Sequence, residues 1–314
     1  MPKSNPSSPR WQATARKAAP SRGETGTARG RGQVTRYLVL TLFLLSLIGC
    51  AILNRYIFVA KQELTATPEK FRLAHQEIWF PARDGVQLNG WFVPGAKDEP
   101  LVLFFHGNAG NLSDNLEYLN LLHGCGFPIF IFDYRGYGNS KGEPLREDDL
   151  YQDARGALSY LKGQGWRHER MIFFGQSLGS AVALQMALEA APAGLIMESS
   201  FTSLKEIVKH FSPLAYYAVG WWGIRLPFDN LAKIERIEVP LLLIHGEMDT
   251  VVPVEMTRRL FSRAAAPKML HIISGGGHCD AFARDSSAYL AAWSSYLLSI
   301  SERLPLRKAQ KTPF

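Results

Sequence analysis

The stretch "FFGQSLGS" at residues 173–180 contains a serine, Ser177, with a glycine two positions to either side. Gly-x-Ser-x-Gly is typical of a sharp strand-to-helix turn, which lifts the serine hydroxyl above a sheet and next to the positive end of a helix. Three fixed residues also occur by chance in roughly one chain of this length in ten. Because a bare hydroxyl is a poor nucleophile, the motif predicts chemistry only where a base and an acid accompany it.

A histidine on a loop after a strand would serve as the general base. Of the eight histidines, His278 fits best, because "IISGGGHCD" leaves the last apolar run of the chain through three glycines. His106 and His245 stand in His-Gly pairs at the ends of other apolar runs, where we expect each imidazole to bond nearby backbone. The sequence therefore predicts His278 as the base.

The acid that orients this base should follow another strand. Asp249 comes directly after "LLLIHGEM", Glu247 lies two residues nearer that strand, and Glu198 ends the preceding apolar run. The chain order Ser177, Asp249, His278 is the order that the triad has in α/β-hydrolases. The order favours Asp249, with Glu198 as the main alternative.

Short apolar runs, each bounded by Gly, Pro or polar residues, alternate with segments of helical periodicity. This pattern is typical of strands buried on both faces of a parallel sheet and joined by right-handed crossover helices, so we expect a doubly wound α/β domain. "HQEIWF" and "QLNGWFV" predict a leading β-hairpin that turns at Asp84-Gly85. The runs are at residues 101–107, 128–136, 171–177, 195–201, 240–246 and 269–275.

The carboxyl ends of parallel strands share one edge of the sheet, where ligands bind. Polar residues gather at these ends, among them Asn108, Ser177 and His278. Cys125 instead precedes its strand and should lie at the opposite edge from Cys279. A strand of five residues is about 16 Å long, and a disulfide tolerates Cα atoms no more than about 7 Å apart. We therefore predict no disulfide between them.

Six motifs, in order, resemble those of the α/β-hydrolase superfamily. They are "HGNAGN" (106–111), "DYRGYGNSKG" (133–142), "GQSLGS" (175–180), "ESSFTSL" (198–204), "HGEMDTVVP" (245–253) and "GGGHCD" (275–280). The chain is most similar to the small, membrane-anchored serine-hydrolase branch with an HGNAGN-type oxyanion loop, over about residues 73–302. The resemblance implies an α/β-hydrolase fold, that is, a mostly parallel sheet with a small helical cap.

By position in these motifs, the resemblance makes Ser177 the nucleophile, Asp249 the acid and His278 the base. The oxyanion hole would use the backbone N–H groups of Asn108 and Leu178. This chemistry proceeds through an acyl-enzyme and needs no metal or organic cofactor. One departure is Cys279, where the family motif has a polar residue, and it would make the site sensitive to thiol reagents.

The net charge of +7 is confined to one end of the chain. Residues 1–36 carry eight basic side chains and one acidic side chain, Glu24, so the remaining residues are neutral overall. The body of the protein thus gives no electrostatic reason to expect nucleic acid as a partner. The tail is rich in Ser, Pro, Gly, Ala and Arg, and we expect it to be disordered.

Residues 37–53, "YLVLTLFLLSLIGCAIL", are uncharged and largely apolar, and they are long enough for a short membrane-spanning helix. The preceding basic residues would keep the N-terminus in the cytoplasm and place the catalytic domain on the other side. Alternatively, Leu47-Ile48-Gly49-Cys50 resembles a lipobox, with Cys50 acylated, if translation starts at Val34. Either interpretation predicts a membrane tether.

The remaining boundaries follow from the same patterns. We expect a linker at 54–72, the catalytic domain at 73–302 and a tail at 303–314. A cap should occupy about 202–238, where "FSPLAYYAVGWWGIRLPF" is dense in aromatic residues. Cap and tether together favour lipid-like or small-molecule acyl esters as substrates. A thioesterase, amidase or peptidase would use the same triad, and a catalytically silent membrane-tethered binding module is the alternative from another class.

Overall fold

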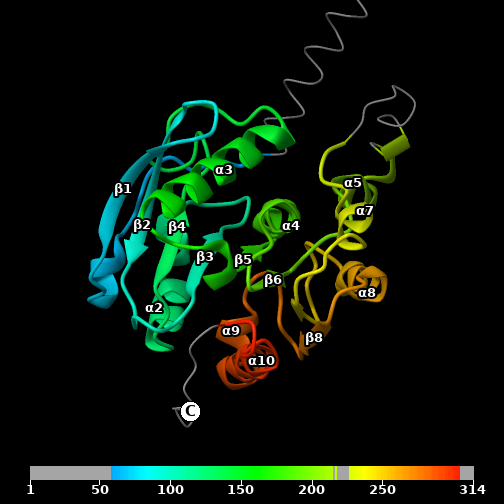
Figure 1. The fold of residues 1–314 in the computed structure, drawn as a ribbon. Coiled ribbons are helices and arrows are strands. Elements are labelled where there is room, and N and C mark those ends of the chain that lie inside the picture. Colours follow the sequence, from blue (N-terminus) through cyan, green and yellow to red (C-terminus); the bar gives the residue numbers. More distant parts are fainter. Residues whose placement is uncertain (1–57, 215, 218–225, 305–314) are drawn as a thin grey trace, which may run out of the picture. The chain divides into compact units, whose positions relative to one another are not determined.

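The computed structural model describes residues 58–214, 216–217 and 226–304 (Figure 1). The predictions for the tail at 1–36, the apolar segment at 37–53, Cys50 and the chain beyond residue 304 lie outside the described residues. No helix within the described ranges is long and apolar enough to cross a membrane.

An eight-stranded sheet forms the centre of the described part of the chain, in the order β1-β2-β4-β3-β5-β6-β7-β8. β1 pairs antiparallel with β2, β2 pairs antiparallel with β4, and all other neighbours are parallel. The predicted doubly wound fold, its hairpin and its six further strands are confirmed. The strands are β1 (Gln76–Pro81), β2 (Gln87–Val93), β3 (Leu101–Phe105), β4 (Ile129–Phe132), β5 (Met171–Gln176), β6 (Gly194–Glu198), β7 (Leu241–Gly246) and β8 (Lys268–Ile273).

The central strands are buried along their whole length because helices cover both faces of the sheet (Figure 1). Along β3, Leu101, Leu103 and Phe105 face one core, whereas Val102 and Phe104 face the other. The first core is covered by α3 (Glu147–Gly163), α4 (Leu178–Ala190), α7 (Asn230–Ile234) and α8 (Val254–Arg263), and the second by α2 (Leu116–Gly124), α9 (Ala281–Arg284) and α10 (Ser286–Ser299). The continuous apolar runs of the sequence thus reflect strands that bury both faces.

The connection from β6 to β7 contains α5 (Leu204–Phe211) and α7. Ser203 caps α5 by accepting a hydrogen bond from the backbone N–H of Glu206, and it also forms an isolated β-bridge with Asp229. The β-bridge therefore brings Ser203, at the start of α5, next to Asp229, at the start of α7. Three short 3-10 helices complete the described elements: η1 (Pro68–Phe71), η2 (Leu112–Asn115) and η3 (His168–Arg170).

The chain before β1 lies along the loop that follows β3. We refer to residues 58–66 as the strap. Its backbone N–H at Val59 donates to Asn108 Oδ1 (3.2 Å), and Ala60 forms a parallel β-bridge with Gly110. Further bonds run from Asn111 Nδ2 to the carbonyls of Lys61 and Glu63, and from the Thr65 N–H to Ser113 Oγ.

Cys125 and Cys279, the cysteines among the described residues, are both free thiols.

Candidate active site

Ser177 lies at the turn between β5, which ends at Gln176, and α4, which begins at Leu178. Its backbone has φ 50° and ψ −116°, a combination that L-residues rarely adopt. The Ser177 N–H donates to the carbonyl of Glu198 at 2.9 Å, and this bond ties the turn to the end of the neighbouring strand β6. The strained turn is the arrangement that the Gly-x-Ser-x-Gly motif predicts.

The flanking glycines are required by close backbone contacts. A Cβ atom on Gly179 would overlap the carbonyl oxygens of Phe105 and His106 at the end of β3. A Cβ atom on Gly175 would overlap the carbonyl oxygen of Gly179 across the turn. The two glycines therefore let the first turn of α4 pack directly on the sheet, and this packing fixes where the Ser177 hydroxyl points.

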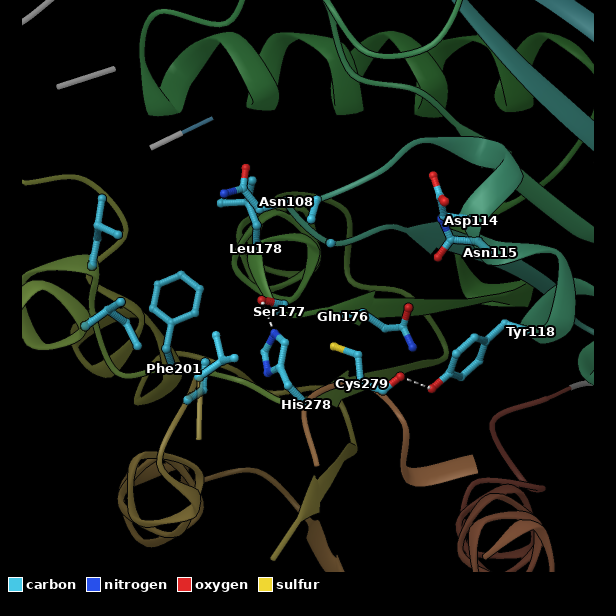
Figure 2. A pocket seen from close by; sticks show the side chains of 16 residues that line it. Asn108, Asp114, Asn115, Tyr118, Gln176, Ser177, Leu178, Phe201, His278 and Cys279 are labelled. Atoms are coloured by element: carbon cyan, nitrogen blue, oxygen red, sulfur yellow. Dashed lines mark hydrogen bonds between the residues drawn. The ribbon is translucent and has the colours of Figure 1, made fainter. Parts of the chain in front are cut away.

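Ser177, His278 and Asp249 form a continuous chain of hydrogen bonds. His278 Nε2 lies 3.1 Å from Ser177 Oγ, and His278 Nδ1 lies 2.8 Å from Asp249 Oδ2 (Figure 2). With the proton on Nδ1, the imidazole donates to the carboxylate and accepts from the serine hydroxyl. The structure thus brings together the three residues that the sequence singled out, from the ends of β5, β7 and β8.

The Asp249 carboxylate is buried and receives several hydrogen bonds. Its Oδ1 accepts from the backbone N–H groups of Val251 (2.9 Å) and Val252 (2.8 Å). Its Oδ2 faces His278 Nδ1 and also His245 Nε2, at 3.1 Å. Burial alone would raise the pKa of Asp249, but the hydrogen bonds from His245, His278 and Val252 outweigh it and hold that pKa well below its usual value. Asp249 is therefore ionised at neutral pH.

His245 is a contributor to the site that sequence reasoning missed. Its Nε2 lies 2.8 Å from the Val252 carbonyl, the backbone contact that we predicted, and its Nδ1 lies 2.7 Å from Thr257 Oγ1. The contact to Asp249 was not predicted. The motif "HGEMD" could have indicated this contact. His245 stands near the end of β7 and Asp249 in the turn that follows, so both lie at the same edge of the sheet.

Glu198 and Glu247, the other candidate acids, have different partners. The buried Glu198 carboxylate accepts from Gln176 Nε2 (3.1 Å), Tyr118 Oη (2.8 Å) and Tyr289 Oη (2.9 Å). Glu247 is bound by Ser274 Oγ at 2.8 Å. Burial raises the pKa of Glu198, although these three hydrogen bonds oppose the shift.

Asn108 and Leu178 lie beside Ser177, where the sequence predicted an oxyanion hole (Figure 2). Leu178 is the first residue of α4, so its backbone N–H belongs to the positive end of that helix. The Asn108 side chain is held by Tyr137 Oη, which donates to its Oδ1 at 2.8 Å, as well as by the Val59 N–H of the strap. The loop that would supply the second donor is thus fixed from two sides.

A cavity of about 470 Å³ opens over Ser177. Its two ends differ in chemistry, and Figure 2 shows Phe201 on one side of Ser177 with Asp114, Asn115 and Tyr118 on the other. We define the apolar end by Leu178, Phe201, Leu204, Ile207, Val251 and Val252, and the polar end by Asp114, Asn115, Tyr118 and Gln176. Such a cavity suits a ligand with one apolar and one polar part.

Cys279 also lines the cavity, with a left-handed backbone (φ 53°). Its N–H donates to Ser199 Oγ at 3.1 Å, and its carbonyl lies 3.1 Å from Tyr118 Oη. Desolvation, followed by the charge of Glu198, raises the pKa of the Cys279 thiol well above its usual value. The thiol is therefore protonated at neutral pH, which argues against the thiol sensitivity that we expected. Among the described side chains, no cluster of His, Cys, Asp and Glu has the arrangement of a metal site.

The sheet order, its helical layers and the serine turn at the end of β5 define an α/β-hydrolase fold. A family model described as "Serine aminopeptidase, S33" matches residues 96–230 and 228–282, which together exceed half of the chain. The protein belongs to this hydrolase family.

Relatives of similar length occur in bacteria and plants. The uncharacterized protein Rv2307c of Mycobacterium tuberculosis is 38% identical over 231 residues, which cover 71% of this chain and 79% of the relative. The α/β-hydrolase domain-containing protein WAV2 of Arabidopsis thaliana is 29% identical over 266 residues, 78% of this chain and 85% of the relative. Among solved structures, the Pyrococcus furiosus esterase Pf2001 superposes with a TM-score of 0.65 at 20% identity, over 77% of this chain and 97% of the esterase.

Proposed function

We propose that the protein is a membrane-tethered serine hydrolase that cleaves acyl esters. The observation that carries this proposal is the hydrogen-bonded chain from Ser177 through His278 to Asp249, which ends in a cavity with an apolar end. The likeness to an esterase supports the same reaction class.

In the proposed reaction, Ser177 Oγ attacks the ester carbonyl carbon while His278 Nε2 takes the hydroxyl proton. The negative carbonyl oxygen of the tetrahedral intermediate accepts from the N–H groups of Leu178 and Asn108, each worth roughly 3–4 kcal/mol by analogy with other oxyanion holes. His278 then gives its proton to the leaving alcohol oxygen, and the C–O bond of the ester breaks. Water, activated by the same imidazole, releases the acid and restores Ser177. Asp249 stabilises the imidazolium throughout.

The cavity favours an amphiphilic ester. The acyl chain would lie against the apolar end, where each buried methylene contributes about 0.8 kcal/mol. The alcohol part would lie toward the polar end. Gln176 Nε2 already binds Glu198, so its Oε1 is the oxygen that remains to accept from a substrate hydroxyl.

An aminopeptidase is the competing activity, because the family description names one. Such an enzyme needs a carboxylate for the substrate ammonium group. Asp114 lines the cavity, but its carboxylate is paired with Lys61 Nζ at 3.0 Å. This ion pair favours an ester over a peptide.

Fluorophosphonate labelling tests the nucleophile. The wild-type chain and a Ser159→Ala control, altered at a hydroxyl on α3 that bonds only the Arg155 carbonyl among the contacts described, should both label. Ser177→Ala should not label. Equal labelling of all three would exclude the serine-hydrolase mechanism and leave the silent binding module. Comparing p-nitrophenyl esters of increasing chain length with aminoacyl anilides then separates the esterase from the peptidase.

The tether is proposed from residues 37–53, either as a spanning helix or as a lipid anchor on Cys50, with the N-terminus in the cytoplasm. Cys50→Ser separates the two. Loss of membrane retention or of processing would indicate the lipid anchor, and unchanged retention would indicate the spanning helix.

A further inference from the structure

The strap determines where the apolar segment joins the catalytic domain. Its first residue, Phe58, is buried and packs edge-on against Phe228 with ring centroids 6.5 Å apart. The next residue, Val59, donates its N–H to Asn108, which lines the cavity over Ser177. The chain therefore reaches the domain beside the mouth of the active site.

Only a short length of chain separates the apolar segment from this point. Residue 53 ends the apolar run, and five residues extend at most about 17 Å. If residues 37–53 lie in a bilayer, Phe58 must stay within roughly that distance of its surface, and Asn108, bonded to the next residue, cannot lie far beyond.

Exposed apolar side chains lie at the end of the helix α5 and just beyond it. Leu204 and Ile207 on one side of α5 line the cavity, so α5 forms part of its rim. Beyond them, three large apolar side chains are exposed: Phe211 (61%), Leu214 (85%) and Tyr217 (68%). Exposed aromatic and aliphatic side chains of this kind are suited to the boundary between lipid headgroups and acyl chains.

Positive charge accompanies this apolar surface. Lys205 and Lys209 each place Nζ 5.5 Å from the ring of Tyr216. A bilayer with anionic headgroups would complement their charge. The residues that precede α7 are also next to the strap. Phe228 packs against Phe58, and the neighbouring Asp229 forms a β-bridge with Ser203 at the start of α5.

We propose that the mouth of the active site faces the bilayer that holds the apolar segment, with α5, Leu214 and Tyr217 resting on its surface. The substrates are then acyl esters that enter the cavity from that bilayer rather than from bulk water. This inference rests on the proposed function, whose reaction and tether it uses.

The test uses the full chain reconstituted in phosphatidylcholine vesicles that contain phosphatidylglycerol. Leu214→Asp removes an exposed apolar side chain at the proposed contact. Leu298→Asp is the matched control, because Leu298 is also exposed (57%) but lies on α10, which packs on the other core of the sheet from α5 and is drawn well below it in Figure 1. Each variant is assayed with a fluorogenic long-chain ester embedded in the vesicle and with a water-soluble butyrate ester.

We expect Leu214→Asp to lower hydrolysis of the embedded ester by about tenfold and to leave butyrate hydrolysis unchanged, whereas Leu298→Asp changes neither. Equal rates for the two variants on the embedded ester would overturn the inference and leave the hydrolase intact. A wild type that hydrolyses neither ester would refute the proposed function itself, and a wild type absent from floated vesicles would refute the tether.

A charge reversal provides an independent measurement. Lys205→Glu with Lys209→Glu should lower hydrolysis of the embedded ester on anionic vesicles by roughly fivefold per lysine, with no loss on pure phosphatidylcholine. An equal loss on both kinds of vesicle would contradict an electrostatic contact with the bilayer.

Discussion

Two carboxyl groups at the ends of adjacent strands of one sheet have pKa values that are shifted in opposite directions. Glu198 ends β6 and Asp249 follows β7, and both side chains are buried at the carboxyl edge beside Ser177. The pKa of Glu198 is raised by burial, whereas hydrogen bonds lower the pKa of Asp249 despite its burial.

The difference lies in the donors. Glu198 receives two phenol hydroxyls and one amide, all neutral groups on α2, α10 and β5. Asp249 receives two backbone N–H groups and two imidazoles, one of which becomes positively charged in the proposed reaction. Position at the sheet edge is therefore not enough to make an acid of the triad, because the surrounding donors decide whether the pKa of a buried carboxyl is raised or lowered.

The strongest test of this comparison is Asp249→Asn. The amide would favour the wrong tautomer of His278, so kcat should fall by about 10⁴-fold, measured with a soluble ester under saturating conditions. Glu247→Gln, two residues away, is the control and should retain wild-type activity. A loss of less than tenfold in Asp249→Asn would show that another group orients His278.

Replacing His245 by Gln should have the next largest effect. Removing one donor from a buried carboxylate costs roughly 1.5–3 kcal/mol, which corresponds to a fall in kcat of about 10- to 100-fold with KM unchanged. Thermal unfolding of the same variant separates positioning from folding. A parallel rise in KM, or a collapse of Tm, would point to a general structural role for His245.

Glu198→Gln should change kcat by less than about threefold, since Glu198 contacts neither His278 nor the Ser177 hydroxyl among the bonds described. Its effect should appear in stability. A carboxyl whose pKa is raised by folding binds more protons in the native than in the unfolded state, so its contribution is complete below the unfolded pKa and declines as pH rises through the folded pKa.

Chemical denaturation from about pH 4.5, near the ordinary pKa of a glutamate, up to about pH 8 checks this sign. The wild type should lose more stability over that interval than Glu198→Gln, which cannot titrate. The opposite order would mean that Glu198 carries a stabilised charge like that of Asp249.

The smallest expected effect concerns Cys279. Because burial and the Glu198 charge raise the pKa of its thiol, iodoacetamide at neutral pH should leave the hydrolase activity unchanged. Mass spectrometry of the unfolded chain, where Cys279 should be alkylated, provides the control. Inactivation that Cys279→Ser abolishes would show a reactive thiol in the cavity.

The sequence was sufficient for the fold and for the residues that meet at Ser177, because strand ends in a parallel sheet can be located from apolar runs alone. It favoured Asp249 over Glu198 from the chain order of the triad, but it gave no information on what surrounds the Glu198 carboxyl. Those surroundings include Tyr118 and Tyr289, which lie 80 and 91 positions away in the chain. Contacts at such separations follow from helix packing and leave no local pattern.

The strap was predicted only as part of a linker at 54–72. Short segments bonded through their backbone, as at Val59 and Ala60, show no apolar periodicity. Its partner Asn108 was assigned to the oxyanion hole through the HGNAGN motif, but nothing in that motif shows that its side chain is held by Tyr137 and the strap.

The backbone of Ser177 has a consequence for sequence drift. With φ at 50°, the serine is held in a conformation that costs on the order of 1–3 kcal/mol for an L-residue and almost nothing for glycine. Selection for stability alone would thus favour Ser177→Gly. This change would raise the free energy of unfolding and remove the nucleophile. A relative with glycine at all three positions 175, 177 and 179 would keep the fold and gain stability, but it would lack the nucleophile.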